Sequence, residues 1–216
     1  MMKQIIGVKH VTMRCVLAFL LVPLFSYAAE NTKNVDEFFG EVVYSQVLGS
    51  PEVIIYSDFT CQYCNALHKT IKRVAKETSI GVKYRFFPMS LENSRSVEFT
   101  KALYCGKKLL PSYEQKQLIG SLYHLARLGV VDTNAAVLST FLKLGFANNE
   151  KLNQCLANND MDIMLKRNLE MLSNLSVGAT PTLYFYNEAG KLSVVKQGAL
   201  SKEQFFEVIK SVKDKP

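Results

Sequence analysis

The spacing of apolar residues changes along the chain, and each change marks an expected element. Residues 53–56, Val-Ile-Ile-Tyr, form a continuous apolar and largely β-branched run, which is typical of a fully buried strand. Between residues 62 and 77 the spacing becomes helical, because apolar side chains recur three and four positions apart at Leu67, Ile71 and Val74. Residues 82–87 then alternate as a strand does and stop at Pro88. The pattern predicts a β-α-β unit.

A long helical block follows this unit. Residues 91 to about 175 contain no convincing strand and divide into helical segments at 94–106, 113–128, 133–144, 149–156 and 161–175. Leu109-Leu110-Pro111 and Gly129 mark two of the joints between them. A block of this size is large enough to pack as an all-helical subdomain.

The strand pattern returns near the C-terminus. Residues 182–186 and 192–195 are expected strands, and Asn-Glu-Ala-Gly at 187–190 joins them as a hairpin turn. Ser201 begins a final helix, in which Gln204 completes a capping box and the apolar face comprises Phe205, Val208, Ile209 and Val212. The sequence therefore predicts an α/β fold with β-α-β and β-β-α halves that flank a helical insertion.

The first 28 residues have the composition of a signal peptide. Basic side chains come first, at Lys3, Lys9 and Arg14. An apolar run follows at residues 15–25, and small residues then lead to an expected cleavage between Ala28 and Ala29. The run has about 11 residues, whereas a membrane-spanning helix needs roughly 20. The sequence thus predicts a cleaved signal peptide at 1–28 and export to the periplasm, with a retained anchor as the alternative.

Composition and charge argue against two classes of protein, namely disordered chains and nucleic-acid-binding proteins. Apolar residues make up 48% of the chain, with 13 Phe and 10 Tyr, which is enough for a sizeable core and argues against global disorder. The formal charge is +7, and removal of the three basic residues of the leader leaves +4 (7 − 3), dispersed along the chain. Since no basic run carries interleaved aromatics, nucleic acid is not an expected partner.

Export changes how the cysteines are interpreted. Cys15 leaves with the leader, and the mature chain keeps Cys61, Cys64, Cys105 and Cys155. An even number of thiols outside the cytosol favours disulfide chemistry over metal binding.

The Cys61-Gln62-Tyr63-Cys64 sequence stands where the first predicted strand gives way to a helix. Unpaired backbone N–H groups and the helix dipole favour a thiolate at this position, so Cys61 is the expected attacking and mixed-disulfide residue. Cys64 lies one turn further into the helix and is expected to resolve the mixed disulfide. The sequence thus indicates a redox-active cysteine pair that needs no cofactor.

Other interpretations of these motifs remain open. A zinc site needs about four ligands, and the sequence has no second CxxC, CxH or HxxxH pair, so no metal is expected. An inert structural disulfide is disfavoured by its placement between a buried strand and a helix. A second motif, Gly178-Ala179-Thr180-Pro181-Thr182, is by itself compatible with an ordinary loop that enters a strand, because proline is tolerated at a strand's first residue.

Taken together, these features resemble the DsbA-like family of periplasmic oxidoreductases. The segment from Tyr56 to Cys64 is similar to the family's active-site segment, and the segment from Gly178 to Thr182 is similar to its cis-proline loop. The likeness covers nearly everything after about residue 40. It implies a thioredoxin-like fold with an inserted all-helical subdomain, divided as 29–90 for the first part of the thioredoxin-like domain, 91–175 for the insertion and 176–216 for the second part.

The resemblance also implies roles for the cis-proline loop. Pro181 is expected in the cis form and against Cys61, where it removes a competing backbone N–H. The backbone of Thr180 is expected to pair with an extended substrate chain, and Thr180 is a candidate for tuning the redox behaviour of the cysteine pair.

Several positions depart from the family's pattern. Strongly oxidising members often carry Pro-His between the cysteines, and Gln62 and Tyr63 stand there instead, so a weaker oxidant is expected. Ile55 occupies the strand position where many relatives have a buried acid that helps proton transfer. Asp58 is the nearest acid, and we expect it to lie too close to the surface to substitute. Phe59 and Tyr63 are expected to be exposed aromatics that contact substrates.

The remaining cysteines and histidines have less specific contexts. Some DsbA-like proteins have a structural disulfide across the helical subdomain, and the contexts of Cys105 and Cys155 look similar. Closing a loop of about 50 residues would contribute roughly 4 kcal/mol in the chain-entropy model, and two buried free thiols are the alternative. His68 is interpreted as a surface or packing residue in preference to a tuning group, and His124 receives no role.

By this resemblance an oxidase is the leading function. Oxidised Cys61–Cys64 is expected to pass its disulfide to unfolded or newly exported cysteine-containing proteins, and to be reoxidised by a membrane quinone-linked partner of the DsbB type. A disulfide isomerase or reductase kept reduced is the alternative. Residues 29–50 are too short for the N-terminal dimerisation domain usual in such isomerases, which favours the oxidase. A monomer is expected, because nothing in the sequence demands more. An exported chaperone-like or structural protein with the same fold is the non-enzymatic alternative.

Overall fold

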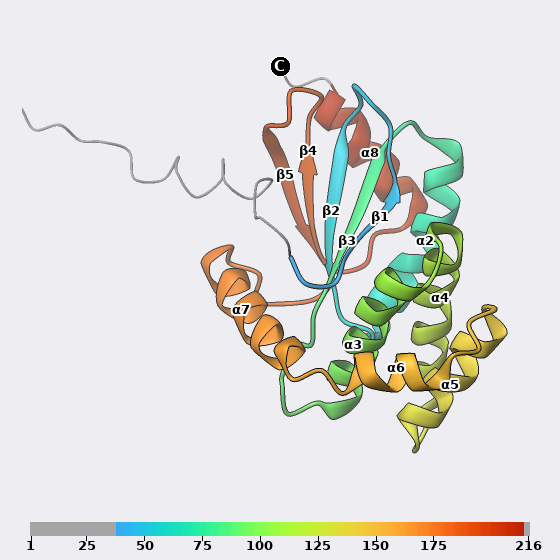
Figure 1. Cartoon of the computed structure of the whole chain (residues 1–216). Coiled ribbons are helices and arrows are strands. Elements are labelled where there is room, and N and C mark those ends of the chain that lie inside the picture. Colours follow the sequence, from blue (N-terminus) through green and yellow to red (C-terminus); the bar gives the residue numbers. More distant parts are fainter. Residues whose placement is uncertain (1–37, 214–216) are drawn as a thin grey trace, which may run out of the picture.

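The computed structural model describes residues 38–213, so the predicted signal peptide lies outside the described part of the chain. A five-stranded sheet forms its centre, with strand order β1-β3-β2-β4-β5 (Figure 1). The strands are β1 (Glu41–Ser45), β2 (Glu52–Ser57), β3 (Gly81–Phe86), β4 (Thr182–Tyr186) and β5 (Leu192–Gln197). The helices are α2 (Gln62–Glu77), α3 (Ser94–Leu109), α4 (Ser112–Leu128), α5 (Thr133–Lys143), α6 (Asn149–Leu156), α7 (Asp160–Asn174) and α8 (Lys202–Lys213). None of the helices within residues 38–213 is long and apolar enough to cross a membrane.

The strand pairing produces the two halves that the sequence predicts. β2 and β3 are parallel and joined by α2, which is the β-α-β unit, whereas β4 is antiparallel to both β2 and β5. β1 adds an antiparallel edge beside β3. β2 is thus a central strand. A short loop after β2 leads directly into α2, so the start of α2 lies at the end of the sheet where β2 finishes.

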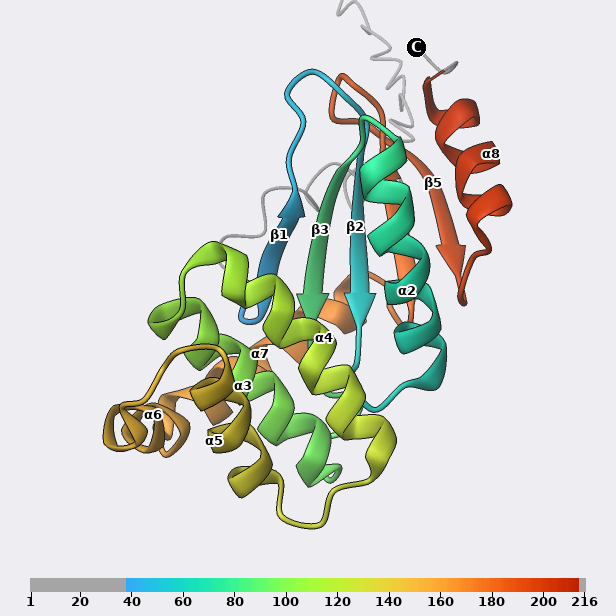
Figure 2. The same ribbon diagram turned by 90° about the vertical axis from the view of Figure 1, so that its right-hand side faces the viewer.

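Different helices cover the two faces of the sheet. α2 and α8 lie in front of the sheet in Figure 2, and α7 lies behind it. On the first face, Phe205 of α8 joins the main core. On the second face, Leu172 of α7 packs in a smaller core with Ile54, Tyr56 and Tyr184 of the sheet. Because both faces are covered, β2 has a continuous apolar sequence instead of an alternating one.

The helical insertion is divided between two places. α3, α4, α5 and α6 pack together at one end of the sheet (Figures 1 and 2). α7 is joined to α3 by an ion pair between Lys101 and Asp162 at 2.7 Å and continues from there across the second face of the sheet. In α7, the Asn168 side chain accepts from the Phe39 N–H at 3.3 Å and donates to the Phe39 C=O at 2.6 Å. The last helix of the predicted insertion therefore also covers part of the second face of the sheet, through Leu172.

Gly106 shows why one helix boundary differs from the expected position. The sequence pattern ends a helical segment at this glycine, but α3 continues to Leu109. A Cβ on Gly106 would lie 2.2 Å from Cδ2 of Leu118 in α4. The glycine therefore allows two helices to approach closely, and it does not end the helix.

The C-terminal helix begins as its capping box predicts. The Ser201 hydroxyl accepts from the Gln204 N–H at 3.2 Å, and the Gln204 side chain accepts from the Ser201 N–H at 2.9 Å. These two bonds satisfy backbone donors that a helix N-terminus leaves without a helical partner.

Candidate active site

Cys61 lies at the N-cap of α2, where a short loop leaves β2. Its backbone is extended, with φ −79° and ψ 118°, and its Sγ accepts a hydrogen bond from the Cys64 N–H at 3.4 Å. The sulfur thus takes the place that a serine or aspartate oxygen takes in an ordinary helix cap. Cys61 is half-buried, whereas Cys64, one turn into the helix, is only 1% exposed. Of the two sulfurs, that of Cys61 is the one open to another molecule.

Asp58 fixes the loop that carries Cys61. Its carboxylate accepts hydrogen bonds from the Thr60 N–H at 2.7 Å and from the Thr60 hydroxyl, the Met89 N–H and the Ser96 hydroxyl, each at 2.8 Å. The residue is 2% exposed, so the expectation that it lies near the surface is wrong. The reason is that the loop after β3 and the start of α3 converge on it and satisfy a buried carboxylate. Asp58 therefore ties three segments together beside the cysteine pair.

The Thr180–Pro181 peptide bond is cis, as the resemblance implied, and its loop lies against Cys61. The Cys61 thiol donates to the Thr180 C=O at 3.3 Å. The Gly198 N–H donates to the Pro181 C=O at 2.8 Å and so anchors the loop to the chain that follows β5. Two sequence motifs separated by 119 residues therefore meet at one sulfur.

The pKa values of the two thiols are shifted in opposite directions. The pKa of Cys61 is lowered from 9.0 to about 6, first because it is hydrogen-bonded by the Cys64 side chain. Hydrogen bonds from the Thr180 side chain and from N–H groups of the first helical turn add to this and together outweigh the opposing effect of partial burial. Burial raises the pKa of Cys64, and its hydrogen bond to Cys61 acts in the same direction. At neutral pH the reduced site is therefore a Cys61 thiolate beside a Cys64 thiol.

The residues between the cysteines are both exposed to solvent. Gln62 and Tyr63 lie on the surface, and the exposed fraction of Tyr63 is 59%. Phe59 is only 2% exposed, so the expectation of exposed aromatics is right for Tyr63 and wrong for Phe59. The Phe59 ring stacks on Phe86 of β3, with centroids 4.3 Å apart, and both belong to the main core. Tyr63 is thus the aromatic beside Cys61 that another molecule can reach.

His68 is a core residue, in line with its interpretation as a packing histidine. It is 3% exposed, and its Nδ1 lies 3.2 Å from the Tyr84 hydroxyl. Burial lowers the pKa of His68 to about 4, so the ring is neutral at physiological pH. His124 is exposed on α4, where its Nδ1 lies 3.3 Å from an Arg127 nitrogen. Across the described residues, no three His, Cys, Asp or Glu side chains are grouped so that they could hold a metal ion.

A pair of buried hydroxyl groups lies next to Cys64, and no sequence pattern indicated it. Ser57 ends β2 and Tyr123 belongs to α4, and their oxygens are 2.6 Å apart. Both residues are buried, with exposed fractions of 0% and 1%, and the Ser57 side chain is hydrogen-bonded to Cys64. Because 66 residues separate them, only the fold brings the two hydroxyls together.

Two cavities lie around this region. The first, of about 290 Å³, lies between α2 and α4, and its lining includes Cys61, Tyr123 and the cations Lys69 and Arg127. The second, of about 340 Å³, is bordered by α7, the loop after β3 and the residues before the cis-proline loop, among them Phe87, Met89, Leu172 and Val177. The first cavity places solvent beside the exposed sulfur.

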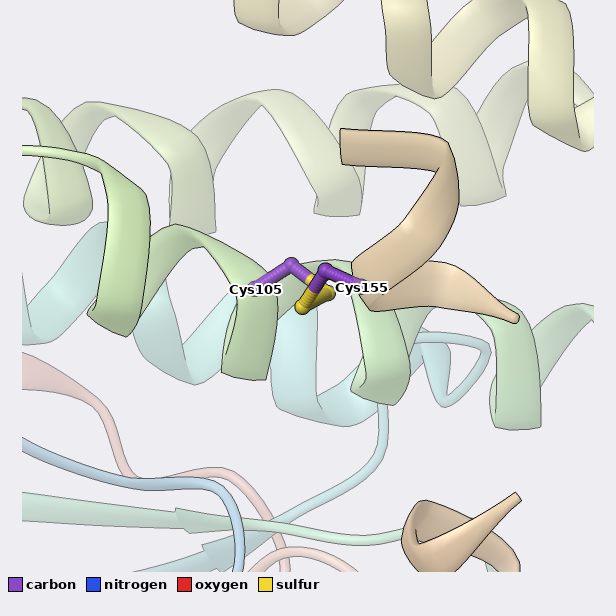
Figure 3. Close-up of a disulfide and its surroundings, with 2 residues drawn as sticks. All are labelled: Cys105 and Cys155. Carbon is purple, nitrogen blue, oxygen red and sulfur yellow. A yellow bond between two sulfur atoms is a disulfide. The ribbon is translucent and has the colours of Figure 1, made fainter. Parts of the chain in front are cut away.

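Cys105 and Cys155 form a disulfide that ties α3 to α6 (Figure 3). Their Cα atoms are 5.9 Å apart, and 50 residues separate them in the chain. Cys105 is fully buried, and Cys155 packs partly buried against the same core. The structure thus contains the bridge that the resemblance implied, in place of two free thiols.

A cysteine pair at the start of the first helix of a β-α-β unit, faced by a cis-proline loop, is the arrangement of thioredoxin-like proteins. Comparison with protein families agrees: the chain belongs to the thioredoxin-like domain family, which matches residues 42–213. The α/β thioredoxin-like fold predicted from the sequence, with helices inserted between β3 and β4, is confirmed.

Solved structures share this fold at low sequence identity. Wolbachia pipientis α-DsbA1 is 16% identical, with a TM-score of 0.64 over 80% of this chain and 89% of that chain. ScsC from Proteus mirabilis is 15% identical, with a TM-score of 0.67 over 86% of this chain and 78% of that chain. Pseudomonas aeruginosa DsbA2 is 16% identical, with a TM-score of 0.63 over 82% and 95%. No curated protein matches the sequence.

Proposed function

We propose that this protein is an exported thiol–disulfide oxidase in which Cys61 and Cys64 carry the disulfide that is passed to substrate proteins. One observation carries the proposal: a half-buried sulfur of lowered pKa lies beside a buried sulfur of raised pKa. A stabilised Cys61 thiolate favours the reduced protein over its disulfide form, which makes the disulfide a better oxidant.

Disulfide transfer proceeds in two exchanges. A substrate thiolate attacks Sγ of Cys61, the bond to Cys64 breaks, and its electron pair and then a proton go to Cys64. A second substrate thiolate attacks the substrate sulfur of the mixed disulfide and expels Cys61 as a thiolate. The substrate loses two electrons as its own disulfide forms, and the cysteine pair gains both. Because a thiol of lower pKa leaves faster, Cys61 is suited to this second exchange.

The surroundings of Cys61 suit an extended and unfolded polypeptide. The Thr180 carbonyl oxygen lies 3.3 Å from the Cys61 sulfur, and it can accept from a substrate N–H once Cys61 is in a mixed disulfide. Large apolar side chains are exposed on the segments that Asp58 ties together or that flank them, namely Tyr63, Met89 and Leu91. A shallow apolar surface of this kind accommodates cysteine-containing chains of varied sequence.

Turnover requires a partner that reoxidises the pair. We assign this role to a membrane quinone-linked oxidase of the DsbB type, and we place the reaction in the periplasm because of the signal peptide predicted at residues 1–28. The choice of partner rests on the resemblance of the active-site segment and the cis-proline loop to those of the DsbA-like family.

Oxidative refolding of reduced ribonuclease A tests the proposal. The oxidised protein should restore ribonuclease activity, and neither Cys61→Ala nor Cys64→Ala should, because a single cysteine carries no disulfide to pass to the substrate. In cells, trapping of free thiols should find the pair mainly oxidised. A pair held mainly reduced would instead favour an isomerase or reductase, and full activity of Cys61→Ala would favour a chaperone-like protein.

A further inference from the structure

The proposed oxidase needs a proton at a buried atom. When the disulfide opens, Cys64 is released as a thiolate inside the core, where its exposed fraction is 1%. Ile55, on the same strand as Ser57, is fully buried and apolar and has no proton to give. The Asp58 carboxylate is already engaged by Thr60, Met89 and Ser96. Another group must therefore bring the proton.

Ser57 and Tyr123 lie where such a group is needed. The Ser57 side chain is hydrogen-bonded to Cys64, and its oxygen is 2.6 Å from the Tyr123 oxygen. The Tyr123 ring packs among Phe59, Phe86 and His68, with centroid distances of 5.1, 6.0 and 5.2 Å. Burying two hydroxyls in such an apolar setting costs free energy unless each is hydrogen-bonded, and here the two hydroxyls bond to each other.

Tyr123, although only 1% exposed, also borders a cavity. It is one of the residues that line the cavity of about 290 Å³ beside Cys61. The order of groups from this cavity inward is Tyr123, Ser57 and the Cys64 sulfur. His68 is a poorer source of the proton, because its burial keeps the ring neutral at physiological pH.

On the basis of the proposed oxidase activity, we propose that Ser57 and Tyr123 form a proton relay for Cys64. As the disulfide opens, the Cys64 sulfur takes the Ser57 proton, Ser57 takes the Tyr123 proton, and Tyr123 takes one from water in the cavity. The substrate thiol released that proton to water when it ionised, so the step is balanced. The same relay run in reverse removes the proton when Cys64 attacks a mixed disulfide. Ser57 touches the reacting sulfur, and Tyr123 acts through Ser57.

Rapid-mixing kinetics in both directions test the relay. Oxidised protein is mixed with reduced glutathione, and reduced protein with glutathione disulfide. Ser57→Ala and Tyr123→Phe should each slow both reactions by about 10- to 100-fold, at or below the low end of the usual range for a positioned proton donor. Both directions should slow by the same factor, so that the equilibrium constant with glutathione stays constant. The double variant should be no slower than the slower single variant, because either change breaks the same chain.

Conservative and matched variants separate a relay from a structural role. Ser57→Thr keeps the hydroxyl and should retain most of the wild-type rate. Tyr84→Phe is the matched control, since it removes a buried phenol of the same core whose partner is His68. It should lower the melting temperature without slowing either reaction. If Ser57→Ala does not fold, Tyr123→Phe against Tyr84→Phe carries the test.

Three results would overturn the relay. They are wild-type rates in Ser57→Ala and Tyr123→Phe, equal slowing in Tyr84→Phe, or slowing in one direction only with a matching change in the equilibrium constant. Each of these leaves the oxidase proposal standing, because that proposal is tested separately by Cys61→Ala.

Discussion

Two cysteine pairs occupy opposite surroundings in this protein. Cys61 and Cys64 lie at the start of α2 as free thiols, and the sulfur of Cys61 faces both solvent and the cis-proline loop. Cys105 and Cys155 join α3 to α6 as a disulfide within the core of the helical end. Both pairs consist of two cysteines, but the pairs differ in how far solvent reaches the sulfur atoms and in which hydrogen-bond donors surround them.

The comparison teaches that reactivity depends on where the sulfur lies. A helix N-terminus offers unpaired N–H groups to a thiolate, whereas Cys105 lies within α3, where backbone N–H groups already bond along the helix. An exposed sulfur also admits a second thiol, and a buried one does not. We therefore assign disulfide exchange to Cys61–Cys64 and stabilisation of the helices to Cys105–Cys155.

The largest contrast is expected between loss of Cys61 and loss of both Cys105 and Cys155. Cys61→Ala should reduce the rate of oxidative refolding to that of the reaction without enzyme, because no other exposed thiolate is available at the site. Cys105→Ala combined with Cys155→Ala should keep most of the rate below its unfolding temperature. A refolding assay measures both, and the assignment of roles is reversed if the second variant is the inactive one.

Stability should respond in the opposite sense. Loss of the Cys105–Cys155 bridge, whose cysteines are 50 residues apart, should lower the free energy of unfolding by about 4 kcal/mol in the chain-entropy model. Urea unfolding of oxidised wild type and of the Cys105→Ala/Cys155→Ala variant measures this difference. A loss below roughly 1 kcal/mol would mean that the bridge contributes little to holding α3 and α6.

The pH dependence of stability should separate the reduced protein from the oxidised one. The pKa of Cys61 is about 6 in the folded protein, against an ordinary value of 9.0. The thiolate therefore stabilises the folded reduced protein fully above pH 9, and this stabilisation is lost as the pH falls through 6. Cys64, whose pKa is raised, acts in the opposite sense, and its contribution is lost above pH 9. The stability of the reduced protein relative to the oxidised one should therefore rise from pH 6 to 9 and fall above it. Urea unfolding of both forms across this range measures the gap, and a gap independent of pH would contradict the acidities assigned here.

The smallest expected effect concerns Thr180. Its side chain helps to lower the pKa of Cys61, so Thr180→Val should raise that pKa part of the way toward 9.0. At pH 6 the alkylation of reduced Cys61 should slow roughly three- to fivefold, which corresponds to one hydrogen bond of about 1 kcal/mol. Iodoacetamide labelling followed by mass spectrometry measures the rate, and an unchanged or faster rate would remove Thr180 from the site's electrostatics.

The sequence predicted the elements of the fold well because periodicity reports which side of an element is buried. The strands at 53–56 and 182–186 and the helix at 149–156 lie where the pattern places them. Periodicity does not say what covers a buried side, and for this reason the position of α7 on the second face of the sheet could not be predicted. The predicted end of a helix at Gly106 was wrong for a related reason, since the role of this glycine depends on its close approach to Leu118 in another helix.

The residues of the candidate site likewise fall into those that the sequence could locate and those that it could not. Cys61, Cys64 and the cis-proline motif could be located from the sequence because each has a local signature. The burial of Asp58 and Phe59 could not, because it results from segments that arrive from β3 and α3. The Ser57–Tyr123 contact likewise depends on how α4 packs, and neither residue has a distinctive neighbourhood in the chain.

Everything proposed for this site depends on Cys61 being ionised at neutral pH because of its place at the start of α2. The rate of iodoacetamide labelling as a function of pH tests this ionisation, in protein whose Cys61–Cys64 pair is reduced and whose Cys105–Cys155 disulfide is intact. We expect a half-maximal rate at about pH 6, with labelling confined to Cys61. A midpoint near 8.5, the value of an ordinary cysteine thiol, would contradict the account.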